Sequence, residues 1–78
     1  MADIKPDEIL DTKGLNCPMP VLKTKKAIDG LASGKILEVQ STDAGSKSDI
    51  PALLSRLGHE LLDTKENGNV ISFFIKKV

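Results

Sequence analysis

The sequence predicts an α/β (α+β) two-layer sandwich of order βαβαββ, with two helices on one face of a mixed four-stranded sheet. Three observations predict this fold. Two segments repeat their apolar residues with helical spacing, four short segments have the composition or alternation of strands, and no linker, repeat or low-complexity stretch separates them. We therefore expect one domain over residues 1–78. The first two strands should be parallel if they share the sheet, with a right-handed crossover, and the strand order stays open.

The first strand is predicted over residues 8–12. Residues 1–7 are polar, contain Pro6 and are expected to form a flexible tail. A first amphipathic helix follows from residue 18 and is expected to end near residues 30–34. Its apolar positions recur at near-helical spacing and should face the core: Val21, Leu22, Ile28, Leu31 and Ala32.

The second strand is predicted over residues 35–42, and the second helix has the clearest periodicity in the chain. Its apolar residues fall at positions i, i+3, i+4 and i+7, namely Ile50, Leu53, Leu54 and Leu57. With Ser48 as N-cap, Pro51 occupies the third helical position, where no amide is needed. Gly58 suits the left-handed residue just past a helix end.

The C-terminal segments predict an antiparallel hairpin over residues 59–65 and 70–76, turning at Asn67-Gly68. In the last strand, alternation directs Ile71, Phe73 and Ile75 toward the core. Phe74 is then expected on the opposite face, as an exposed apolar residue or a partner contact.

Composition and charge weigh against several classes of function and site. Eleven basic and eleven acidic side chains give a net charge of zero, which disfavours direct binding to nucleic acid or to an anionic membrane. The N-terminus has no signal-peptide pattern, so we expect a cytoplasmic protein. One cysteine and one histidine cannot build a closed zinc site, and no cofactor is expected. We also expect a monomer.

The only cysteine, Cys17, lies in residues 14–20, with the sequence GLNCPMP. Prolines are favoured where helical amides have no partner, so Pro18 and Pro20 are assigned to positions N1 and N3, with Cys17 as N-cap. They are expected to fix the turn rather than to pack in the core. Free amides such as that of Met19, together with the helix terminus, should stabilise the thiolate and lower the pKa of Cys17.

The alternative for Cys17 is a buried, inert cysteine that acts as a small hydrophobe. Close by, Lys23, Lys25 and Lys26 could attract an acidic partner surface, or could form an ordinary solvated helix face. His59 is the only candidate general base in the physiological range, but it lies about forty residues further along the chain.

Three local patterns together resemble the TusA/SirA-like sulfur-carrier family: residues 14–20, residues 49–51 (DIP) and residues 58–61 (GHEL). The resemblance covers nearly the whole chain. It implies a two-layer α/β fold and a persulfide on Cys17. From the residues themselves we expect Gly14, Leu15, Pro18, Met19 and Pro20 to form the supporting turn and Lys23 and Lys26 to be candidate partner contacts. Asn16 departs from the pattern, because some members that act in tRNA thiolation have a basic residue there.

The family resemblance implies a sulfur carrier rather than an enzyme that turns over small molecules. Family members take sulfur from a cysteine desulfurase or a rhodanese-like donor. They pass it to acceptor proteins in tRNA thiolation, molybdenum-cofactor synthesis or sulfur oxidation. Two alternatives come from other classes, a regulatory or nucleic-acid-binding module with an initiation-factor-like fold and a structural interaction domain with an unreactive Cys17.

Overall fold

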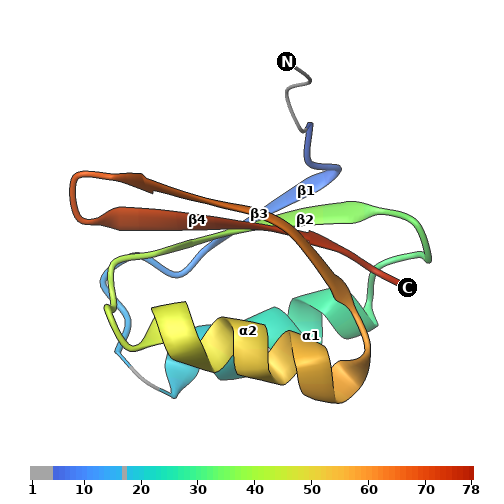
Figure 1. Ribbon diagram of the computed structural model, residues 1–78, viewed down its shortest axis with the longest axis horizontal. Coiled ribbons are helices and arrows are strands. Elements are labelled where there is room, and N and C mark those ends of the chain that lie inside the picture. The colour runs from blue at the N-terminus through green and yellow to red at the C-terminus, as the bar shows by residue number, and fades with distance from the viewer. Residues whose placement is uncertain (1–4, 17) are drawn as a thin grey trace.

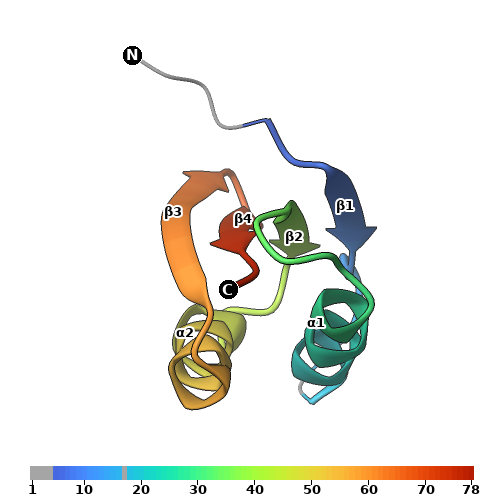
Figure 2. The ribbon, with the colours of Figure 1, turned by 90° about the vertical axis from the view of Figure 1, so that its right-hand side faces the viewer.

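The computed structural model describes residues 5–16 and 18–78 and confirms the predicted two-layer fold. Two helices lie against one face of a four-stranded mixed sheet (Figures 1 and 2). The elements follow the predicted order: β1 (Glu8–Asp11), α1 (Met19–Asp29), β2 (Ile36–Ser41), α2 (Ser46–Leu57), β3 (Glu60–Asn67) and β4 (Val70–Lys76). None of the helices within these described residues is long and apolar enough to cross a membrane.

The sheet has the strand order β1-β2-β4-β3, so the last strand of the chain occupies an interior position. β1 and β2 pair in parallel, as expected for strands joined by a helical crossover, and the other two pairings are antiparallel. The expected tail includes Asp7, but the Asp7 amide donates to the Ile36 carbonyl (2.7 Å) and its carboxylate accepts from the Ile36 amide (2.8 Å). The tail therefore does not extend to Asp7.

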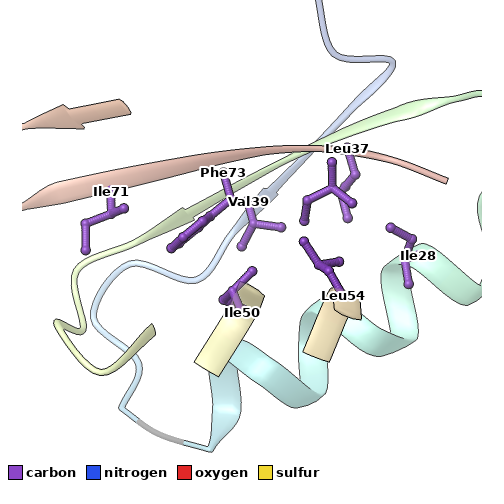
Figure 3. Close-up of a cluster of buried hydrophobic side chains, with 8 residues drawn as sticks. Ile28, Leu37, Val39, Ile50, Leu54, Ile71 and Phe73 are labelled. Atoms are coloured by element: carbon purple, nitrogen blue, oxygen red, sulfur yellow. The ribbon is translucent and has the colours of Figure 1, made fainter. Parts of the chain in front are cut away.

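The core lies between the sheet and the two helices (Figure 3). It confirms the predicted inward set of β4, because Ile71, Phe73 and Ile75 are all buried. The helices add Ile28, Ile50 and Leu54, and β2 adds Leu37 and Val39.

The core-facing stripe of α1 differs from the prediction. Leu22 is 53% exposed and Ala32 is exposed, whereas Pro20, Thr24 and Ile28 are buried. Pro20, Thr24 and Ile28 follow each other at i, i+4 and i+8, which is one helix face. Thr24 can be buried because its hydroxyl donates to the Pro20 carbonyl (2.6 Å), so its polar atom is satisfied.

The predicted start of α2, with Ser48 as N-cap, is wrong by three residues. The helix begins at Ser46 with Gly45 as N-cap, and Pro51 lies inside it. The amides of Ser46 and Ser48 donate to the carbonyls three residues earlier, those of Asp43 and Gly45. The turn before the helix therefore continues directly into it, and no side-chain cap is needed at Ser48. Pro51 has no N–H, and the Lys47 carbonyl therefore lacks the usual donor four residues on.

The other turns agree more closely with the sequence. Gly58 has φ +82° and ends α2 in the left-handed conformation, with its amide bonded to the Leu54 carbonyl, as predicted. The hairpin loop is Gly68-Asn69 rather than Asn67-Gly68, because Asn67 still pairs with Val70. Only its first residue has positive φ (Gly68, +64°), as in a type II′ turn, where glycine is favoured at that position.

Phe74 is only 6% exposed, so the expectation of an exposed side chain is wrong. It does lie on the sheet face opposite to Phe73, as alternation predicts. Because β4 is an interior strand, Phe74 has neighbours on both sides, Glu38 on β2 and Asp63 on β3. The Lys65 ammonium also lies 5.4 Å from the centre of its ring.

Candidate functional site

The predicted catalytic residue, Cys17, lies outside the residues that the structure describes, so the site is defined by the segments on either side of it. Residues 12–16 lead from the end of β1, and residues 18–22 begin α1. Since β1 and β2 are parallel, the loops that follow them emerge at the same end of the sheet (Figure 1). The segments that flank Cys17 therefore lie beside the loop that follows β2.

The approach to Cys17 is fixed to the end of β2. Thr12 is buried, and both its amide (2.8 Å) and its hydroxyl (2.6 Å) donate to the Gln40 carbonyl. The Gly14 amide donates to the Thr42 hydroxyl oxygen (2.9 Å), and Gly14 has φ +82°, a conformation in which a side chain is strained. Leu15 is half-buried and its amide returns to the Thr12 carbonyl (3.1 Å). The loop before Cys17 is thus an ordered turn that is hydrogen-bonded to the end of β2.

The first turn of α1 begins one residue later than predicted. Pro18 is the N-cap (φ −95°, ψ 11°), Met19 is the first helical residue and Pro20 is the second. The assignment of Cys17 as N-cap is therefore wrong. Both prolines still occupy positions where a helix has no use for an amide, which is the physical reason for the prediction.

The Met19 amide is not available to a thiolate, contrary to the prediction. It donates to the Asn16 carbonyl at 2.9 Å. The two prolines contribute no N–H groups, so the first turn of α1 offers few free donors. The helix terminus remains, and it contributes only about 0.3–1 kcal/mol to a nearby anion. The expected lowering of the Cys17 pKa thereby loses its larger cause.

The two prolines of the turn also have different roles. Pro18 is exposed, as expected of a residue that only shapes the chain. Pro20, in the first turn of α1, is fully buried, so the expectation that neither proline is a packed residue is wrong for Pro20. The first turn of α1 therefore has a buried side, on which Pro20 lies.

An exposed face on α1 extends from this turn. It comprises Met19, Leu22, Lys23 and Lys26, which neighbour one another at i+3 and i+4. Met19 is 41% exposed and Leu22 is 53% exposed, which is high for large apolar side chains. Within residues 5–16 and 18–78 neither Lys23 nor Lys26 forms an ion pair, whereas Lys25 pairs with Asp29 (3.5 Å).

A groove of about 240 Å³ lies between α1 and α2 beside the same turn. The sequence did not identify its lining, which comprises Pro18, Val21, Asp49, Ala52, Leu53 and Arg56. The periodicity of the second helix predicts Leu53 in the core, and Leu53 is buried. No sequence signal indicates that Ala52 and Arg56 share a surface with Pro18, because this depends on how the two helices pack.

His59 is far from this turn. It follows the C-terminal end of α2, whereas Cys17 precedes the N-terminal end of α1, and the two helices run in the same direction (Figure 1). Its ring nitrogen Nδ1 accepts a hydrogen bond from the Val78 amide (3.2 Å). This geometry gives no support to His59 as a general base for Cys17.

Comparison with known proteins gives consistent matches. A family profile described as "Sulfurtransferase TusA" matches residues 8–77. The chain is 49% identical over 74 residues to YrkI of Bacillus subtilis, covering 95% of this chain and 99% of that protein. It is 46% identical over 77 residues to "Sulfur carrier protein TusA" of Allochromatium vinosum, covering 99% of each. The crystal structure of a SirA-like protein from Desulfitobacterium hafniense has the same fold, with a TM-score of 0.79 at 24% identity over 88% of this chain and 95% of that one.

Proposed function

The chain belongs to the TusA family of sulfur carriers, and on this premise we propose that it holds sulfur as a persulfide on Cys17. The sulfur comes from a cysteine desulfurase or a rhodanese-like donor, and it passes to an acceptor protein. The acceptor acts in one of three pathways that are consistent with the family: tRNA thiolation, molybdenum-cofactor synthesis or sulfur oxidation. We assign the reaction to the cytoplasm, where thiols are kept reduced.

The transfer is a thiol exchange that needs no external oxidant. The Cys17 thiol loses its proton, and the thiolate attacks the outer sulfur of the donor's persulfide. A new S–S bond forms on Cys17 while the donor's S–S bond breaks, and the donor cysteine leaves as a thiolate that takes up a proton. Passing the sulfur to an acceptor thiolate repeats the same step with Cys17 as the leaving group.

The observation that best supports this proposal is the exposure of the chain on both sides of Cys17. Asn16 and Pro18 are exposed, although Thr12 and Pro20 anchor the same segment in buried positions. An exposed segment held at both ends allows two different proteins to reach the same sulfur in turn. The sequence also contains no second cysteine that could discharge the persulfide within the chain.

The partner face is proposed to be the α1 face of Met19, Leu22, Lys23 and Lys26. Exposed apolar side chains next to lysines that form no ion pair among the described residues fit a partner surface that combines apolar and acidic groups. The lysines then serve mainly to steer the encounter, since exposed charges change association rates more than they change affinity.

Intact-mass spectrometry tests the proposal. After incubation with a cysteine desulfurase and cysteine, or with a rhodanese-like donor and its sulfur source, the protein should gain the mass of one sulfur atom, which a reductant removes. Cys17→Ser should keep the fold and gain nothing, and because the chain has one cysteine any adduct on wild type is assigned without ambiguity. No adduct from any of several donors, or an equal adduct on the variant, would contradict the proposal.

A further inference from the structure

We propose that the groove between α1 and α2 receives an apolar side chain of the sulfur donor protein, while an acidic residue of that donor pairs with Arg56. The inference rests on the proposed function, because it names the part of this chain that recognises the donor. It concerns a surface distinct from the exposed α1 face, on the side of α1 that faces α2 (Figure 2).

The position of the groove is the first argument. Pro18 forms part of its wall and is also the residue that follows Cys17 in the chain. A side chain bound in the groove therefore contacts the residue that is covalently joined to the cysteine. A donor that fills the groove is therefore bound against the residue next to the cysteine that is proposed to attack its persulfide.

The size and lining of the groove indicate the kind of occupant. A volume of about 240 Å³ is below the roughly 300–1,000 Å³ of small-molecule and cofactor pockets, and it suits one side chain of a protein. Four of the six lining residues are apolar: Pro18, Val21, Ala52 and Leu53. An apolar anchor that enters such a groove leaves water, which is the usual source of binding energy at an interface core.

Charge indicates what surrounds that anchor. Arg56 is exposed in the last turn of α2 and forms no ion pair within residues 5–16 and 18–78. The two helices together carry five basic and two acidic side chains, whereas the four strands carry two basic and six acidic ones. The helix layer is therefore positive although the whole chain is neutral, and it selects an acidic partner surface.

Two variants and a matched control test the groove. Ala52→Leu places a larger side chain on an exposed position of the groove, and Arg56→Glu reverses the charge at its rim. The control is Ser55→Leu, because Ser55 is exposed on the same helix and does not line the groove. Thermal unfolding of each variant establishes that it is folded before transfer is measured.

The measurement compares two sulfur sources for each variant. The first is the donor protein that loads wild-type Cys17, and the second is inorganic polysulfide, which needs no docking surface. With the donor protein, Ala52→Leu and Arg56→Glu should each lower kcat/KM about tenfold through a higher KM, as loss of an interface anchor does. Loading by polysulfide should stay within about twofold of wild type for both variants, and Ser55→Leu should match wild type with both sources.

The possible failures are distinct. If neither source loads wild-type Cys17, the proposed function itself is wrong. If wild type is loaded but Ala52→Leu and Arg56→Glu behave like Ser55→Leu with the donor protein, the groove does not receive the donor. If the two variants lose polysulfide loading to the same extent as donor loading, the groove shapes the cysteine turn rather than binding a partner, and the inference is overturned.

Discussion

Gly14→Ala isolates the contribution of the loop before Cys17, because the chain supplies a matched control at Gly58. Both glycines have φ +82°, and at each an added Cβ would meet nothing within 4 Å. The cost of alanine is therefore one of backbone conformation alone. A left-handed residue costs about 1–2 kcal/mol, and the stiffer unfolded chain returns about 0.4–1 kcal/mol, which leaves a net loss near 1 kcal/mol for either variant.

The two variants should be equally destabilised and functionally different. A loss of about 1 kcal/mol lowers Tm by about 4–8 °C in a domain of this size. In Gly14→Ala the loop can relieve its backbone strain by breaking the hydrogen bond from the Gly14 amide to Thr42. Returning the loop to its wild-type conformation for sulfur transfer then costs up to the same 1 kcal/mol, which corresponds to about fivefold slower loading. In Gly58→Ala any relaxation occurs at the far end of α2.

Circular dichroism melts and the rate of sulfur loading from the donor protein check this pair. We expect similar melting temperatures for the two variants, about fivefold slower loading for Gly14→Ala and wild-type loading for Gly58→Ala. Wild-type loading by a Gly14→Ala protein that is as destabilised as its control would refute the view that this turn delivers the cysteine. Equal slowing of both variants would show that global stability, and not the loop, sets the rate.

Three further predictions follow from the core and the turn. Phe73→Ala should cost about 3–5 kcal/mol in urea unfolding because Phe73 is 1% exposed in the core, and a loss below about 1 kcal/mol would show that the packing is misassigned. Pro18→Ala should keep a dispersed NMR spectrum and change only the reactivity of the cysteine, because Pro18 is exposed. Pro20→Ala should lose more stability, because Pro20 is buried. Unfolding of the Pro18 variant would show that Pro18, and not only Pro20, is needed for the fold. Iodoacetamide labelling of Cys17 should be half-maximal slightly below the pH of about 8.5 typical of a free cysteine, since the anion is favoured by the helix terminus but not by the engaged Met19 amide. A labelling midpoint at or above the pH typical of a free cysteine would show that the helix terminus does not stabilise the thiolate either.

The sequence alone determined the order of elements, the class of fold and most of the core. These features follow from periodicities of two and 3.6 residues, which depend only on near neighbours along the chain. The prediction for Gly58 is confirmed for the same reason, since a left-handed helix end is a property of one residue's backbone. The resemblance carried by residues 14–20 likewise led to the family that the comparisons then showed.

Only the tertiary structure decided features that depend on residues distant in sequence. Phe74 is buried because β4 lies between β2 and β3, and local alternation contains no information about strand order. Pro20, in the first turn of α1, is buried, which the local proline pattern did not indicate. The Gly14–Thr42 hydrogen bond spans 28 residues, and the groove unites Pro18 with Arg56 through the packing of two helices. The sequence therefore proposed Cys17 as the reactive residue, while non-local burial and pairing determined the surface formed by the segments on either side of it.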